Sequence, residues 1–373
     1  MKKILFLTGT RADFGKIKSL IQILEKDSGF VPYIAVTGMH LQEEYGYTLI
    51  EIERCGFQNI HTFPNHTDET TMDLTLAKTI EGLSAYVKEC QPDLIVVHGD
   101  RVETLAGAIV GSLNNILVAH IEGGEISGTV DELIRHSVSK LCHVHFVSNE
   151  QAAKRLIQMG EMASSVFIIG SPDVDIMFSE NLPELEIAKN YYGIGFDDFA
   201  IAMFHPVTTE ATHMIQYSDN FTQALLNDHH NYVVIYPNND LGSKAILNSY
   251  EKLKGHPRFR IFPSLRFEYF LTLLKNSQFI IGNSSAGIRE APYYGIPIIN
   301  IGTRQQNRAV HSDIINTDYS IESISEALKI VDSHQVQLQQ EDFGAGNSAE
   351  LFLDSLKNQD IWQLNHQKQF RDL

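Results

Sequence analysis

The stretch DLIVVHGDRVETLAGAIVGSLNNILVAHIEGGE, residues 93–125, contains one complete unit of the fold. DLIVV and ILVAHI are short, almost continuous apolar runs, and the longer segment VETLAGAIVGSL separates them. Continuous apolar strands joined through helices are typical of a parallel sheet that is covered on both faces. In such a sheet the carboxyl ends of the strands line the ligand-binding edge, so Asp100 and Glu122, which follow the two runs, are expected to lie there.

The same alternation extends along most of the chain. KILFL and VPYIAV precede this unit, and HVHFV and VFIIG follow it, up to about Gly170. A second series begins with FAIAMF and continues through YVVIY, FRIF, QFIIG and IPIIN, with helical stretches such as RFEYFLTLLKN and SAGIREAPYYG between them. The pattern predicts an α/β protein with two Rossmann-like domains that face a central cleft, and a ligand between the carboxyl edges of the two sheets.

Length and pattern together predict the domain boundaries. The 373 residues fit two domains at the usual size of about 150 residues each. Residues 1–170 are expected to form the first domain, 171–198 a hinge and an entering helix, and 199–345 the second domain. Residues 346–373 contain an amphipathic segment, which is expected to be a docking helix.

The composition excludes several classes of protein. Lys and Arg number 29 against 46 Asp and Glu, a net charge of −17, which argues against binding to a nucleic-acid backbone. No apolar stretch approaches the roughly 18–20 residues that span a bilayer, so no membrane partner is expected. The three cysteines form no CxxC pair, which supports neither a disulfide framework nor a zinc ribbon and favours a cytoplasmic location.

Small anions remain candidate ligands despite the negative charge, because arginines lie beside the glycine turns. These arginines are Arg11, Arg101, Arg289, Arg304 and Arg308. The turn GTRADFGK, residues 9–16, is not a nucleotide P-loop, because five residues separate its glycines and Ile17 replaces the required Ser or Thr. Its backbone N–H groups could contact an anion or a sugar, or the segment could be a plain strand-to-helix turn.

Three carboxylates have the strongest claim to chemistry. Asp131 joins Asp100 and Glu122 in HIEGGEISGTVDELIRH, residues 120–136. Asp100 and Asp131 each precede a helical run and could be helix caps, whereas capping does not explain Glu122 between an apolar strand and Gly123-Gly124. Clustered carboxylates raise one another's pKa, so one can hold a proton near neutral pH while another acts as a base. General acid and base catalysis is therefore the leading interpretation.

The second domain contains a matching candidate for a diphosphate site. In IIGNSSAGIREAPYYG, Ser284 and Ser285 take cap positions at the start of a predicted helix, where N–H donors suit a diphosphate and Glu290 could hold a ribose diol. A simple serine cap is the alternative. His205 also follows a strand and could pair with phosphate or be structural.

The remaining histidine motifs indicate structure more than metal binding. His143 and His145 share one face of a strand, but no carboxylate or cysteine at matching spacing supports a metal site, which favours core or subunit-contact histidines. The triplet DHH, residues 228–230, is expected to be a solvated loop.

Taken together, the motifs resemble those of the hydrolysing UDP-N-acetylglucosamine 2-epimerases of sialic-acid biosynthesis. The resemblance runs to about residue 310, through GTRADFGK, VTGMH, HGDR, HIEGGEISGTVDELIRH, GSPD, FHPVTTE, PNND, SLRFEYF and GNSSAGIREAPYYGIPIINIGTRQQNR. It implies a fold like that of the GT-B glycosyltransferases, with the final helix packed on the first domain. It also implies that no cofactor or metal is needed and that the protein is a homodimer or homotetramer.

The resemblance also implies roles for single residues. Asp100, Glu122 and Asp131 would be catalytic: UDP would leave C1 as C2 loses its proton, and the 2-acetamidoglycal would then be hydrated to N-acetylmannosamine. UDP would be bound by Arg11, Arg101, His205, Asn238, Leu265, Phe270, Ser284, Ser285, Glu290 and Arg304. Among these, the segment around Leu265 and Phe270 would contact the uracil.

The loops favour the hydrolysing branch of the family over its non-hydrolysing sister. The sister enzymes typically have GTRPE, HGDT and HVEAGLR where this chain has GTRAD, HGDR and HIEGGE. The sugar is less well defined, because a related hydrolysing branch acts on UDP-2,4-diacetamido-2,4,6-trideoxyhexose in a pathway of the legionaminic-acid type. A GT-B glycosyltransferase and a UDP-sugar-binding protein without catalysis are further alternatives.

Overall fold

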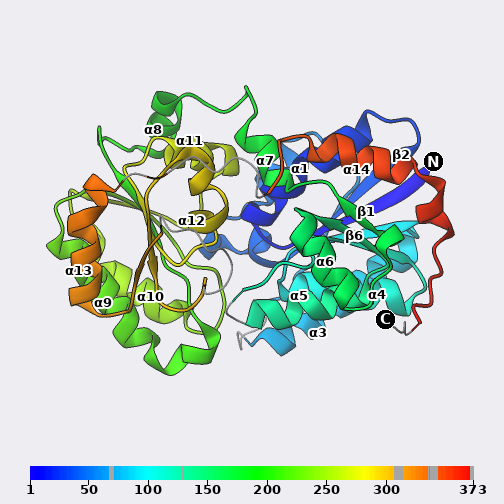
Figure 1. Cartoon of the computed structure of the whole chain (residues 1–373), viewed down its shortest axis with the longest axis horizontal. Helices are drawn as coiled ribbons and strands as arrows, with labels where there is room; N and C mark the ends of the chain where they lie inside the picture. The colour runs from blue at the N-terminus through cyan, green and yellow to red at the C-terminus, as the bar shows by residue number, and fades with distance from the viewer. Residues whose placement is uncertain (67–70, 128–129, 306–313, 335, 337–342, 370–373) are drawn as a thin grey trace. The chain divides into compact units, whose positions relative to one another are not determined.

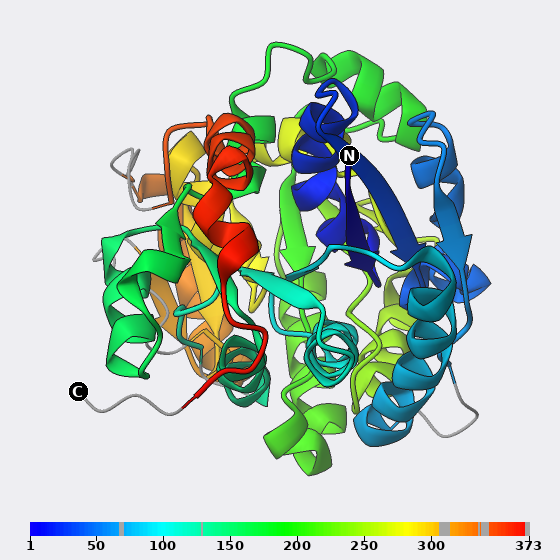
Figure 2. The same cartoon turned by 90° about the vertical axis from the view of Figure 1, so that its right-hand side faces the viewer.

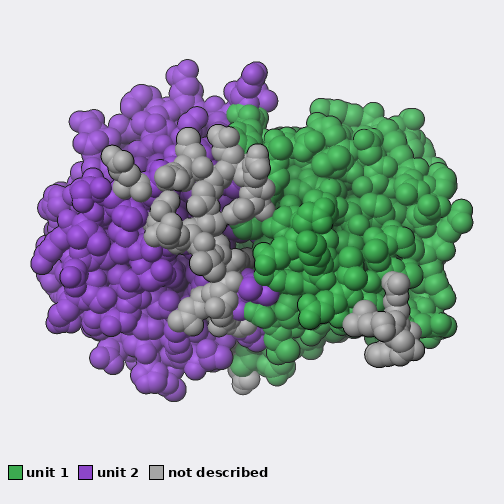
Figure 3. Space-filling view, in the orientation of Figure 1, with its two compact units in different colours: residues 1–125, 131–179, 341–373 green, residues 126–130, 180–340 purple. Residues whose placement is uncertain are grey.

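The structure of the protein is a computed structural model that describes all residues except 67–70, 128–129, 306–313, 335, 337–342 and 370–373. By its contacts the chain divides into two units, which Figure 3 shows in different colours. Unit 1 consists of residues 1–125, 131–179 and 341–373, and unit 2 consists of residues 126–130 and 180–340. Each unit is built on its own parallel sheet, which confirms the predicted α/β class with two Rossmann-like domains. The sequence-based boundaries at residues 170, 198 and 345 stay predictions.

The sheet of unit 1 has seven strands in the order β3-β2-β1-β4-β5-β6-β7, and neighbouring strands are parallel throughout. Its strands are β1 (Lys2–Thr8), β2 (Phe30–Val36), β3 (Ile60–Thr62), β4 (Leu94–His98), β5 (Leu117–Ile121), β6 (Val144–Val147) and β7 (Val166–Ile168). β4, β5 and β6 are buried at every residue. Burial from both faces is what their continuous apolar sequences require.

The connections between these strands are mostly helical (Figure 1). The helices are α1 (Arg11–Glu25), α2 (Leu49–Glu53), α3 (Met72–Cys90), α4 (Val102–Leu113), α5 (Val130–Leu141), α6 (Glu150–Gln158) and α7 (Pro172–Met177). α1 begins at a regular cap, because the side chain of Thr10 accepts a hydrogen bond from Asp13 N. Among the residues that the structure describes, no helix is long and apolar enough to cross a membrane.

The C-terminal helix α14 (Ser348–Lys357) belongs to unit 1 and packs against α1 and α7. Figure 2 views unit 1 with this red segment in front. Asp175 of α7 accepts hydrogen bonds from Ser348 N and Ala349 N, both at 2.8 Å. It thereby binds two of the N–H groups that have no partner within the first turn of α14. Phe352 is fully buried, with its ring centroid 4.8 Å from that of Phe146. The helix is therefore part of the core of unit 1.

Unit 2 repeats the same architecture with six strands in the order β10-β9-β8-β11-β12-β13, again parallel throughout. The strands are β8 (Ala200–Met203), β9 (Tyr232–Ile235), β10 (Phe259–Phe262), β11 (Ile280–Gly282), β12 (Ile298–Ile301) and β13 (Ile314–Thr317). The helices are α8 (Leu185–Tyr192), α9 (Met214–Asn227), α10 (Ser243–Tyr250), α11 (Phe267–Lys275), α12 (Ala286–Arg289) and α13 (Ile321–Ile330).

Strand order locates one ligand-binding edge in each unit. In unit 1 the order reverses between β1 and β4, and in unit 2 it reverses between β8 and β11. At such a point the loops that leave the two strands run in opposite directions and leave the strand ends uncovered, which is where open α/β sheets bind ligands. The loops after β1 and β4 carry residues 9–10 and 99–101, and those after β8 and β11 begin at residues 204 and 283.

Replacing Phe352 with alanine should lower the free energy of unfolding of unit 1 by about 3–5 kcal/mol, because a fully buried ring would leave a cavity. Leu351 of the same helix is 37% exposed and is the matched control, with an expected loss of less than about 1 kcal/mol on replacement with alanine. Urea unfolding can be followed by the fluorescence of Trp362, the single tryptophan, which packs against the same core. Equal unfolding midpoints for the two variants would contradict a core role for α14.

Candidate active site

Glu122 is the most constrained of the predicted catalytic carboxylates in unit 1. It directly follows β5, is 4% exposed, and adopts the left-handed conformation with φ of 67°. A residue with a side chain rarely takes this conformation, and such strain concentrates at functional sites. Its Oε1 lies 3.1 Å from His98 Nε2 and 3.6 Å from Lys16 Nζ, and it accepts a hydrogen bond of 3.2 Å from Ser171 Oγ. Glu122 is therefore surrounded by donors and positive charges.

His98, the last residue of β4, links Glu122 to the first loop. Its Nδ1 lies 2.8 Å from Oδ1 of Asp13, whose other oxygen accepts a hydrogen bond of 3.2 Å from Gly9 N. Burial lowers the pKa of His98, but the charge of Glu122 and the contact with Asp13 outweigh burial and raise the pKa to about 9.

Asp100 and Asp131 share a partner that the sequence analysis did not identify, Arg135 of α5. The Arg135 side chain is fully buried and forms an ion pair with Asp100. Burial lowers the pKa of Arg135, but this effect is outweighed by the charges of four carboxylates, so the pKa is raised. These carboxylates are, in order of effect, Asp100, Glu125, Glu122 and Asp131. The three predicted catalytic residues thus interact with one buried cation.

Helix capping explains neither Asp100 nor Asp131. Arg101, not Asp100, occupies the N-cap of α4, and Asp131 is the second residue of α5. Gly128 and Thr129, from the stretch that led to Asp131, lie outside the described residues. The capping alternative for these two carboxylates is therefore set aside.

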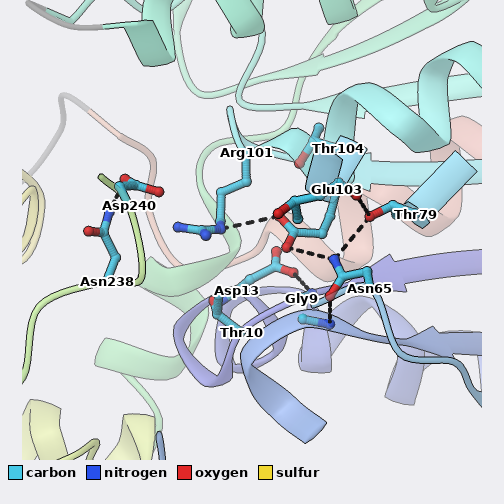
Figure 4. Close-up of polar contacts among 12 residues, drawn as sticks. Gly9, Thr10, Asp13, Asn65, Thr79, Arg101, Glu103, Thr104, Asn238 and Asp240 are labelled. Carbon is cyan, nitrogen blue, oxygen red and sulfur yellow. Dashed lines mark hydrogen bonds and ion pairs between the residues drawn. The ribbon is translucent and has the colours of Figure 1, made fainter. Parts of the chain in front are cut away.

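The predicted UDP-binding arginines of unit 1 are held by carboxylates. Arg101 Nε lies 3.4 Å from Oε2 of Glu103, a residue that is 3% exposed. Asn65 donates hydrogen bonds to Glu103 and to Thr79, and Figure 4 shows both amide and guanidinium directed toward the Glu103 carboxylate. Arg11 lies 3.7 Å from Glu51. Both arginines are thus oriented by buried or half-buried acids.

Sequence reasoning missed several members of this group. Asp13, Lys16, His98, Asp173 and Arg135 all stand inside the quoted motifs, but none was assigned a role there. Lys16 lies 3.2 Å from Asp173 of α7, a residue that is 1% exposed. By the contacts of the chain, α7 belongs to unit 1. Each of these motifs begins at the end of a strand. That shared position could have indicated from the sequence that these residues lie close together.

In unit 2, Asn283 joins the loops after β8 and β11. Its amide accepts a hydrogen bond of 2.6 Å from His205 N and donates one of 2.9 Å to His205 O. Its carbonyl accepts hydrogen bonds from Arg304 at 3.1 Å and from Gln305 at 2.9 Å. His205 Nδ1 accepts a hydrogen bond of 3.0 Å from Asn238 N. The structure thus brings together three predicted UDP-binding residues, His205, Asn238 and Arg304, around a buried asparagine that was not predicted.

The predicted helix over SAGIREAPYYG is shorter in the structure. α12 ends at Arg289, and a single 3₁₀ turn, Ala291–Tyr294, follows it. Pro292 has no N–H to continue an α-helix, and Gly295 takes a left-handed conformation, so the break has a local cause. Ser284 Oγ accepts a hydrogen bond of 3.3 Å from Ala286 N, whereas Ser285 occupies the cap without a side-chain bond. The serines directly follow Asn283, which contacts His205, but a long helix does not support them.

The other predicted contacts of unit 2 are largely buried. Glu290 and Arg289 are 3% and 2% exposed. Leu265 and Phe270 are also buried, beside Arg266, whose guanidinium stacks on Tyr191 and Tyr269 at 4.9 and 5.6 Å. Arg308 lies outside the described residues.

The other histidines that the sequence motifs contain make contacts within the protein. His145 Nε2 lies 2.9 Å from Glu161, and His143 contacts the backbone oxygen of His366. His230 was expected in a solvated loop and is instead 5% exposed, because Asp228 and Asp332 bind its two ring nitrogens. Asp228, His229 and His230 form the one group of possible metal ligands among the described residues. The occupied nitrogens of His230 make it a poor ligand.

Comparisons with known proteins agree with this architecture. The chain is 48% identical to a UDP-N-acetylglucosamine 2-epimerase from Neisseria meningitidis over the full length of both proteins. It is 33% identical to a UDP-N,N'-diacetylbacillosamine 2-epimerase (hydrolyzing) from Legionella pneumophila, over 88% of each chain.

A solved structure shows the same fold. The UDP-GlcNAc 2-epimerase from Methanocaldococcus jannaschii, in complex with UDP-GlcNAc and UDP, superposes with a TM-score of 0.81 at 22% identity over 95% of this chain and 99% of that one. A sequence model of the family described as UDP-N-acetylglucosamine 2-epimerase matches residues 22–357. The protein therefore belongs to the UDP-N-acetylglucosamine 2-epimerase family.

Proposed function

We propose that the protein is a hydrolysing UDP-N-acetylglucosamine 2-epimerase, which converts UDP-N-acetylglucosamine and water into UDP and N-acetylmannosamine, the precursor of sialic acids. One observation carries the proposal: two of the predicted carboxylates are held in place by buried charged groups, Asp100 by an ion pair with Arg135 and Glu122 by His98 at 3.1 Å and Lys16 at 3.6 Å. The charge of Asp131 also acts on Arg135. The relative from Legionella pneumophila, which is named as hydrolysing, supports the hydrolytic outcome.

The reaction needs the number of acid and base groups that unit 1 supplies. A base removes the C2 proton while the bond between C1 and the diphosphate oxygen breaks, which gives a 2-acetamidoglycal and UDP. Water then adds its hydroxyl to C1, and a proton reaches C2 from the opposite face, so the configuration at C2 inverts. Two proton-transfer groups and one group that directs water are required, and three carboxylates can fill these roles.

The groups of unit 2 suit the leaving nucleotide. His205, Asn238, Arg304 and Ser284 provide hydrogen-bond donors and positive charge in the loops after β8, β9, β11 and β12. Such donors stabilise the charge that develops on the diphosphate as it leaves, typically by a few kcal/mol each. Arg11 and Arg101 of unit 1 are further candidates for the same role.

Incubation with UDP-N-acetylglucosamine in deuterated water tests the reaction directly. We expect phosphorus NMR to show free UDP and proton NMR to show N-acetylmannosamine that carries deuterium at C2, because C2 is reprotonated from solvent. UDP-N-acetylmannosamine as the product would mean the non-hydrolysing reaction. Turnover of the 2,4-diacetamido-2,4,6-trideoxy sugar nucleotide alone would mean the alternative substrate, and turnover that needs a sugar acceptor would mean a glycosyltransferase.

The variants Asp100→Asn, Glu122→Gln and Asp131→Asn should each reduce kcat by roughly 10²–10⁴-fold, because each removes a proton-transfer group. Their affinity for UDP, measured by calorimetry, should stay close to that of the unchanged protein. Glu132→Gln is the matched control, since Glu132 neighbours Asp131 on α5 but pairs with His136. Turnover like that of the control in any of the three variants would remove that residue from the mechanism.

His205→Ala should weaken UDP binding by roughly 10–100-fold, the worth of a hydrogen bond to a charged group. The change also removes the acceptor that holds Asn238 N, which acts in the same direction. His229→Ala is the control, because the His229 side chain is 77% exposed in the same unit. Equal UDP dissociation constants for the two variants would exclude a contact between His205 and the diphosphate.

A further inference from the structure

Asp13, His98 and Glu122 form a continuous chain of buried side chains in unit 1. His98 places Nδ1 2.8 Å from Asp13 and Nε2 3.1 Å from Glu122, and the exposures of the three side chains are between 5% and 13%. A neutral imidazole has one N–H and one lone pair. His98 Nδ1 is hydrogen-bonded to Asp13, whereas Nε2 is buried 3.1 Å from Glu122 without an aligned hydrogen bond. A neutral imidazole with its N–H on Nδ1 would therefore leave the Nε2 lone pair buried beside the Glu122 carboxylate. The arrangement of Asp13, His98 and Glu122 therefore calls for one proton more than a neutral imidazole carries.

We propose that His98 is a positioning residue that carries this additional proton, and that it thereby holds Glu122 as the ionised carboxylate that removes the C2 proton of the sugar. The assignment of Glu122 as the base rests on the proposed function. The charge state of His98 rests on the geometry alone, so the two parts can be tested separately.

The buried charges around the chain favour the proton on His98. Lys16 lies 3.6 Å from Glu122 and 3.2 Å from Asp173, so that three acids, Asp13, Glu122 and Asp173, surround it and His98. The ion pair of Arg135 with Asp100 adds one charge of each sign nearby. With a neutral His98, the charge of Lys16 would therefore be left to balance three acids, a costly arrangement in a medium that screens poorly. A protonated His98 reduces the imbalance to a single charge.

The other titratable groups nearby do not compete for this proton. Arg135 interacts with Glu122 and is always charged. His120 of β5 contacts Ser139 Oγ and the oxygen of Gly99, and burial lowers its pKa to about 3. His98 is different because carboxylates flank both of its nitrogens, and its pKa of about 9 agrees with the proton count.

This arrangement separates the roles of the three carboxylates. A carboxylate fixed by His98, Lys16 and Ser171 on one oxygen, Oε1, cannot be the group that starts the reaction protonated. It can accept a proton from C2, and the left-handed backbone at Glu122 fixes where its side chain begins. By the same argument Asp100, which is paired with Arg135, suits the group that directs water, and Asp131 is left as the proton donor to C2.

The first test determines the protonation state of His98 in the protein without substrate. Protein labelled with ¹⁵N at its 16 histidines is titrated from pH 5.5 to 9.5, and long-range proton-nitrogen spectra give the protonation state of each ring. His98→Gln assigns the signals of His98. We expect two protonated nitrogens on His98 up to about pH 8, whereas His120 should be neutral throughout. A single neutral tautomer of His98 at pH 7 would overturn the proposal.

The second test follows kcat/KM as a function of pH. Activity of the unchanged protein should fall as the pH rises through about 9, where His98 loses its proton. Asp13→Asn removes one of the charges that stabilise imidazolium, so the fall should move to lower pH by roughly one unit or more. His98→Gln keeps an amide donor toward Glu122 but no charge. Its kcat/KM should be lower than that of the unchanged protein at neutral pH and should not decrease further as the pH rises through about 9.

His145→Gln is the matched control, since it also replaces a buried imidazole that contacts a carboxylate, Glu161, outside the candidate site. It should keep the alkaline fall of the unchanged protein. An alkaline fall at the same pH in Asp13→Asn and His98→Gln would overturn the positioning role. A protonated His98 in a protein without epimerase turnover would instead reject the proposed function and leave the charge arrangement in place.

Discussion

The reversal of strand order in each parallel sheet is the constraint on which the rest of the structure depends. The order reverses between β1 and β4 and between β8 and β11. At such a point the connections leave the two strands in opposite directions, so the loops that begin there can place polar side chains next to a buried sheet edge. Residues at or next to these strand ends contact one another across the reversal. Asp13 and His98 meet in unit 1, and His205 and Asn283 meet in unit 2. The position of the candidate site is thus a consequence of topology.

A charged side chain can be buried at such an edge only if groups of opposite charge or hydrogen-bond partners lie next to it. Moving a carboxylate or an ammonium group out of water costs several kcal/mol, which nearby charges of opposite sign and hydrogen bonds must offset. In unit 1, Lys16 and Arg135 offset the cost for Glu122, Asp173 and Asp100. Removal of one partner would leave the others unpaired, so the same contacts that shape the site also support the fold around it. In unit 2 a neutral side chain has the corresponding place. Asn283 forms hydrogen bonds with the backbone of His205 and with the side chain of Arg304.

The sequence predicts the elements well and their cross-contacts poorly. Continuous apolar runs identified the buried strands. Asp100 lies in the loop after β4, at the reversal in unit 1, and Glu122 directly follows the neighbouring strand β5. The pairs that complete the site are far apart in the chain: His98 and Asp13 are separated by 85 positions. A single histidine at the end of an apolar strand carries no signal of its own. The same reason explains His230, which the local sequence places in solvent and which Asp332, 102 positions away, binds in the core.

In the reaction proposed above, the choice between hydrolysis and simple epimerisation follows the elimination step, because the glycal is already formed when a group adds to C1. It must lie in the groups that decide whether UDP or water adds to C1. The motifs that favour hydrolysis differ from those of the sister branch at Asp13, Arg101 and Glu125, where the sister motifs have Glu, Thr and Leu. In this structure Asp13 binds His98, and Arg101 binds Glu103. Glu125 accepts a hydrogen bond from Ser148, and its charge acts on Arg135. Two of these three residues, Asp13 and Glu125, therefore act on the charged groups around Glu122 and Asp100, through His98 and Arg135 respectively. Arg101 belongs to a separate group with Glu103 and Asn65.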